Sequence, residues 1–119
     1  MTPDEIMRGL TAKNLELSTK NDELIRLVEE AAENKRVFLI ANATKITALK
    51  IDGASVTLIR DLVKGDKVVA DLQYKWDVSE GVLMACRERI KDLRESIGTY
   101  RSVLTWKRVE MQTTPNQEA

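Results

Sequence analysis

The stretch from Val69 to Leu104, VADLQYKWDVSEGVLMACRERIKDLRESIGTYRSVL, carries a core-type side chain at alternating spacings of three and four residues. Only Ser79 among these positions is polar. The positions, called the seam below, are Val69, Leu72, Trp76, Ser79, Leu83, Cys86, Ile90, Leu93, Ile97, Tyr100 and Leu104. This is the a/d stripe of a heptad repeat over about five heptads, and it predicts a long helix packed along a partner helix.

The partner helix is expected upstream, because no proline interrupts the chain between Pro3 and Pro115. Two rows there recur every seven residues. The first is apolar and contains Leu10, Leu17, Leu24, Ala31 and Phe38; the second is mixed and contains Asn14, Asn21, Val28, Lys35, Asn42 and Leu49. The first 21 residues therefore either continue this helix or form a separate arm.

Turn residues divide the chain between the two long segments. Asp52-Gly53-Ala54-Ser55 predicts a turn, with Ser55 capping a short helix, and Asp66 caps the next helix after Gly65. We expect helices at about 3–51, 56–64 and 67–111 within a single domain, 1–112, followed by a flexible tail, 113–119. The fold class is all-α, a long antiparallel coiled-coil-like hairpin with a short connecting helix.

A second apolar row on the last helix predicts self-association. Val68, Val78, Val82 and Ala85 would remain exposed in an isolated hairpin. Burial of each valine stabilises by about 1.5–3 kcal/mol, so we expect a homo-oligomer, with a dimer favoured, that forms a helical bundle. Gly81 and Gly98 lie off the seam, which suggests close packing against another helix.

The composition excludes most catalytic chemistry. The chain has no histidine, and its one cysteine, Cys86, lies on the seam. No Gly-rich phosphate loop or nucleophile motif is present. We therefore expect no enzyme, cofactor, metal site or small-molecule substrate. A chain without an apolar run of about 18 residues or an apolar N-terminal segment is expected to be cytoplasmic, without membrane contact.

Charge is unevenly distributed although the formal net charge is zero. Residues 1–34 hold eight acids and four bases, whereas residues 35–64 hold six bases and two acids. The bases nearest the predicted turn are Lys45, Lys50, Arg60 and Lys64. We predict that these four contact phosphate groups or an acidic partner, although a solvated helix face would have the same composition.

Four short stretches resemble known proteins: LKIDGASV at 49–56, KGD at 64–66, ACRERIKDL at 85–93 and YRSVL at 100–104. Residues 45–105 resemble a group of small helical proteins encoded by phages and prophages of Gram-positive bacteria. The resemblance implies an accessory role in DNA metabolism and supplies no catalytic residues.

The leading hypothesis is a non-enzymatic phage accessory protein that acts by binding in DNA replication or recombination. One alternative is an inhibitor or adaptor that docks a host protein through its acidic half, without nucleic-acid contact. Another is a structural or assembly protein of the virion.

Overall fold

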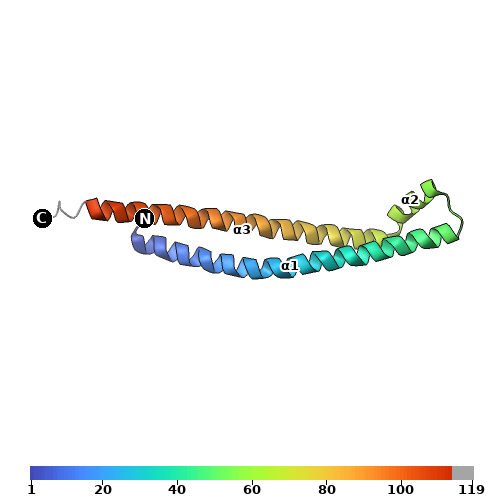
Figure 1. Ribbon diagram of the computed structural model, residues 1–119, viewed down its shortest axis with the longest axis horizontal. Coiled ribbons are helices and arrows are strands. Elements are labelled where there is room, and N and C mark those ends of the chain that lie inside the picture. Colours follow the sequence, from blue (N-terminus) through green and yellow to red (C-terminus); the bar gives the residue numbers. More distant parts are fainter. Residues whose placement is uncertain (114–119) are drawn as a thin grey trace. The chain divides into compact units, whose positions relative to one another are not determined.

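The computed structural model describes residues 1–113, which form three helices (Figure 1). Helix α1 spans Pro3–Ile51, α2 spans Val56–Gly65 and α3 spans Lys67–Thr113. The all-α class and the helical hairpin predicted from the sequence are confirmed. Thr113, the first residue of the predicted tail, is helical, and the rest of that tail lies outside the described residues.

Local capping explains where the helices begin. The Thr2 amide donates to the Glu5 carboxylate, and the Glu5 amide donates back to Thr2 Oγ1 at 3.2 Å, which forms a capping box. Ser55 Oγ accepts from the Leu58 amide at 3.3 Å at the start of α2. The turn before α2 requires glycine at position 53, where φ is +83°.

The helices contribute to two compact units. Unit 1 contains residues 1–23 and the described part of 86–119, and unit 2 contains residues 24–85. Each unit therefore combines a segment of α1 with a segment of α3, and unit 2 also holds α2. The sequence had predicted one domain.

Unit 1 is closed by apolar side chains from both of its segments. Ile6 of α1 and Leu93 of α3 are completely buried. The Tyr100 ring lies against Gly9, and the Cys86 thiol donates to the Lys20 carbonyl oxygen over 3.6 Å. These contacts fix the antiparallel register of the two segments.

Unit 2 has a core in which α2 takes part. Ile59 and Val63 are the buried residues of α2, and they cluster with Val69 of α3. Partly buried side chains that pack against this cluster are Phe38, Ile46, Leu49 and Ala54. The Phe38 ring also packs against the Trp76 ring, with 5.5 Å between the ring centroids and a tilt of 32° between the ring planes. Unit 2 therefore holds α2 against α1 by apolar contacts.

All eleven seam positions of α3 are buried or half-buried, including the polar Ser79, whose hydroxyl donates to the Trp76 carbonyl at 2.7 Å. On α1 the predicted mixed row is only partly inward-facing, because Asn21, Asn42 and Leu49 are half-buried whereas Asn14, Val28 and Lys35 are exposed. The buried or half-buried row is Ile6, Lys13, Lys20, Leu27, Asn34 and Ala41. Lysines in this row obscure the periodicity, since their aliphatic stems pack while the ammonium groups reach solvent.

The two glycines inside α3, Gly81 and Gly98, do not mark a close helix contact within the described chain. A Cβ placed on Gly81 or Gly98 would meet no atom within 4 Å among the described residues. Contacts within the described chain therefore do not account for these two glycines.

Candidate anion-binding groove

A groove of about 360 Å³ lies between the C-terminal part of α1 and α2, within unit 2. It contains three cations, one amide and four apolar residues. The lining residues are Asn42, Ile46, Lys50, Val56, Ile59, Arg60, Val63 and Lys64. Three of the four cations predicted from the sequence therefore share one site.

Helical spacing positions the groove residues. Asn42, Ile46 and Lys50 follow one another at intervals of four on α1, so they lie on one side of that helix. On α2, Arg60 and Lys64 are also four residues apart and each follows a buried residue, Ile59 or Val63. Because Ile59 and Val63 are buried and anchor α2, they also fix the side of the helix on which Arg60 and Lys64 lie.

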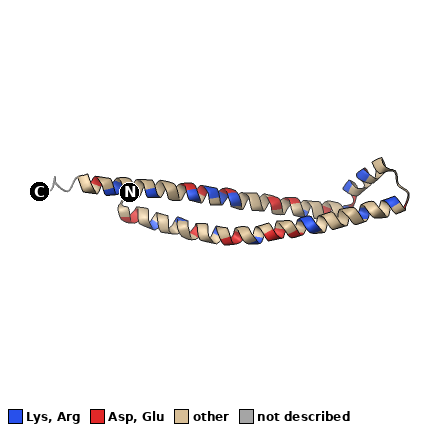
Figure 2. Cartoon of the chain, viewed as in Figure 1, with Lys and Arg blue, Asp and Glu red and all other residues tan. Residues whose placement is uncertain are grey.

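The groove is electropositive. Lys50, Arg60 and Lys64 are its only charged residues, and no carboxylate lines it. Within residues 1–113, none of the three forms an ion pair with a carboxylate. Figure 2 shows the same concentration of Lys and Arg on α2 and the last turns of α1. Like charges held together in this way favour an anionic ligand.

Lys45, the fourth predicted cation, is not a groove residue. Its Nζ lies 3.4 Å from Asp66 Oδ1, and Asp66 caps α3 by accepting from the Val69 amide at 3.1 Å. That backbone hydrogen bond is the main reason why the pKa of Asp66 lies below its ordinary value; Lys45 lowers it further, while partial burial opposes both effects. Lys45 therefore links α1 to the start of α3 through its ion pair with Asp66.

The apolar members of the groove could not be assigned from the sequence. The pattern in α2 places Leu58, Ile59, Leu62 and Val63 on one side, yet only Ile59 and Val63 are buried. Leu58 and Leu62 are exposed. The strong amphipathicity of α2 indicates that it packs somewhere, but not which residues of α1 it meets.

The groove suits binding of oxyanions. Lys and Arg donate charge-assisted hydrogen bonds to phosphate or carboxylate oxygens, and the Asn42 amide supplies a further donor. The lining contains no Ser, Thr or Cys nucleophile and no carboxylate or histidine that could act as its general base. Among residues 1–113, no group of three or more His, Cys, Asp or Glu residues is arranged to hold a metal ion.

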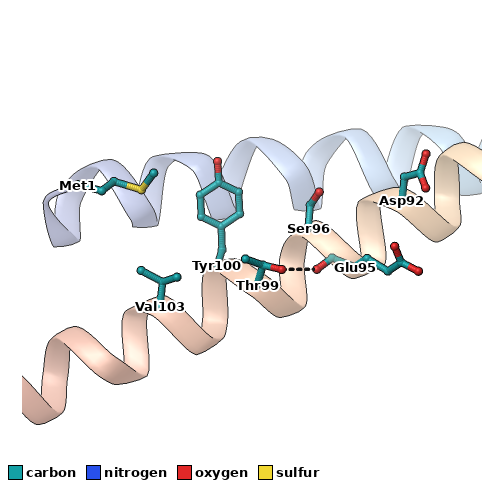
Figure 3. Close-up of a pocket in the computed structure, with 7 residues that line it drawn as sticks. All are labelled: Met1, Asp92, Glu95, Ser96, Thr99, Tyr100 and Val103. Carbon is teal, nitrogen blue, oxygen red and sulfur yellow. Dashed lines mark hydrogen bonds between the residues drawn. The ribbon is translucent and has the colours of Figure 1, made fainter.

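A larger cavity, of about 650 Å³, lies in unit 1 and has the opposite charge (Figure 3). Asp92 and Glu95 are its charged side chains, and the Thr99 hydroxyl donates to the Glu95 carbonyl oxygen at 3.1 Å. Its other lining residues are Met1, Ser96, Tyr100 and Val103. The sequence had not singled out this cavity.

Within the described residues, none of the helices has the length and apolarity that a membrane span requires. Comparison of the chain with protein-family models, curated proteins and solved structures gave no match. Function is therefore inferred from the residues of the chain itself.

Proposed function

We propose that the protein is a non-enzymatic DNA-binding accessory protein of replication or recombination, in the phage setting implied by the resemblance of residues 45–105. One observation carries the proposal. Lys50, Arg60 and Lys64 converge on one groove that contains no acid, and no carboxylate neutralises them within residues 1–113.

The mechanism is electrostatic. Each cation that contacts a phosphate releases condensed counterions, and this term depends on salt but not on sequence. Three contacts predict a slope of about −2.7 for the logarithm of the association constant against the logarithm of salt concentration on duplex DNA. The groove thus holds the sugar-phosphate backbone of the DNA, and it offers few groups that could distinguish one base from another.

Fluorescence anisotropy with short labelled single- and double-stranded DNA at low salt tests the proposal. The groove variant is Lys50→Gln/Arg60→Gln/Lys64→Gln. The matched control, Arg87→Gln/Lys91→Gln/Arg94→Gln, removes the same number of charges from exposed cations of α3. We expect affinity to fall at least tenfold in the groove variant and less than threefold in the control. Circular dichroism verifies that both variants remain helical.

Two outcomes would contradict the DNA proposal. If the two triple variants lost DNA affinity equally, binding would depend on the total charge of the protein and not on the groove. An absence of wild-type binding at low salt would contradict DNA binding itself, because phosphate contacts strengthen as salt falls.

A second candidate function is that of a protein-binding adaptor without nucleic-acid contact. The acid-lined cavity of unit 1 favours it, since Asp92 and Glu95 would accept hydrogen bonds from a basic partner segment. The measurement is capture from host lysate. A single stoichiometric protein that is lost with Asp92→Asn/Glu95→Gln, and retained with the groove variant, would support this function.

A further inference from the structure

An unpartnered apolar row runs along α1 within unit 2. Its members, called the α1 row below, are Ile25, Val28, Ala32, Leu39, Ile40 and Ala43. Spacings close to multiples of the helical repeat place them on one side of α1. All are exposed, with Ile25 at 62% and Val28 at 41%, whereas the core residues Leu27 and Ala31 are buried. Nothing else in unit 2 covers this row.

Two opposite charges accompany the row. Glu29 is exposed and has no ion pair within residues 1–113. Arg36 donates from Nε and Nη2 to the Glu33 carboxylate at 3.0 and 2.6 Å. A guanidinium has five N–H donors, so Arg36 retains donors on Nη1 for a second carboxylate.

Four of the six members of the row are placed symmetrically about the level of residue 34. Ile25 and Ala43 lie nine residues to either side of that level, and Val28 and Ile40 lie six residues to either side. A second α1 placed antiparallel about a two-fold axis at this level would therefore oppose Ile25 to Ala43 and Val28 to Ile40, and would place Ala32 at the level of Arg36 and Leu39 at the level of Glu29. The same arrangement brings Glu29 of one copy within one turn of Arg36 of the other.

We propose that a second copy of this chain occupies the α1 row in an antiparallel, two-fold symmetric contact. Charge complementarity selects this orientation, because a parallel pair would place Glu29 beside Glu29 and Arg36 beside Arg36. The contact from Ile25 to Ala43 is about 27 Å long at 1.5 Å per residue. It differs from the surface expected from the sequence, which was the row of Val68, Val78, Val82 and Ala85 on α3.

The contact also spaces the two anion-binding grooves. Ile46 lies twelve residues from the two-fold level, so the two copies of Ile46 are separated by about 36 Å along the helix pair. This separation matches one turn of duplex DNA, about 34–36 Å. The match with DNA rests on the proposed function, whereas the dimer contact does not.

Sedimentation equilibrium over a wide concentration range tests the contact. The wild-type chain should approach twice the 13.5 kDa monomer mass. Val28→Glu should weaken association at least tenfold, because it sets a charge in the apolar row. Val82→Glu is the matched control, with the same chemistry at an α3 valine of similar exposure, and it should have no effect.

A charge swap gives a second, independent measurement. Glu29→Arg places like charges opposite one another and should weaken association, and Glu29→Arg/Arg36→Glu should restore it. A monomer at all concentrations would overturn the proposal, as would a dimer that Val82→Glu disrupts and Val28→Glu leaves intact. Loss of DNA binding in the groove variant with an unchanged dimer, or the reverse, separates this contact from the proposed function.

Discussion

Lys45 of α1 and Asp66 at the start of α3 form an ion pair, with Nζ 3.4 Å from Oδ1. This pair separates Lys45 from the three cations of the groove. We therefore expect Lys45→Gln to change DNA affinity less than twofold, whereas Lys50→Gln lowers it about three- to tenfold. Anisotropy titrations at one low salt concentration make the comparison, and equal effects of the two substitutions would remove the distinction between these lysines.

Asp66 should also make stability depend on pH. Its pKa is below the ordinary value of 3.8, first because the Val69 amide donates to the carboxylate and also because Lys45 lies nearby. A group with a lowered folded-state pKa contributes stability above its unfolded pKa and loses that contribution as pH falls through the folded value. Urea unfolding from pH 5 downward should therefore show a steeper loss below about pH 4 in the wild type than in Asp66→Asn. Parallel profiles would contradict this role.

The contact between Gly9 and Tyr100 predicts a non-additive pair of substitutions. A Cβ on Gly9 would lie 2.7 Å from Tyr100 Cε1, so the ring has to move. Gly9→Ala gains about 1 kcal/mol of helix propensity but incurs an overpacking cost of about 1–3 kcal/mol. We expect Gly9→Ala to destabilise the wild-type protein by about 1 kcal/mol and to stabilise the Tyr100→Leu variant, in which the ring is absent.

Denaturant unfolding of the four proteins in this double-mutant cycle gives the interaction energy. Gly81→Ala, where the added Cβ meets no atom within 4 Å, is the control and should stabilise by about 1 kcal/mol. The same effect of Gly9→Ala with and without Tyr100 would show that the ring does not limit this position.

The seam should dominate stability in unit 1. Leu93 is completely buried, so Leu93→Ala should lower the free energy of unfolding by about 2–5 kcal/mol. Leu15→Ala alters a side chain that is 71% exposed and should change it by no more than about 0.5 kcal/mol. Thermal and urea denaturation followed by circular dichroism provide both values. A small effect at Leu93 would mean that the seam is not the core.

Periodicity predicted the α3 side of the core because almost every seam position is apolar. It missed the neighbouring α1 row through Leu27 and Asn34 because Lys13 and Lys20, which are half-buried, resemble surface residues in a sequence. Packing geometry, and not residue type, decides which positions of that helix face inward.

Charge clustering predicted the cations of the site but not their grouping. Lys50, Arg60 and Lys64 meet because Ile59 and Val63 anchor α2 against α1. That contact joins residues from separate helices, and no local pattern specifies it. Lys45 belongs to the same charge cluster in the sequence, yet it forms an ion pair with Asp66, the residue that caps α3.

The salt dependence of duplex binding is the decisive measurement for phosphate binding by the groove. The logarithm of the association constant, plotted against the logarithm of salt concentration, should fall with a slope of about −2.7 for each groove engaged. Substitution of Lys50, Arg60 and Lys64 by glutamine should bring the slope close to zero, while the triple control on α3 preserves it. A wild-type slope near zero, or one unchanged by the groove substitutions, would contradict phosphate binding by this groove.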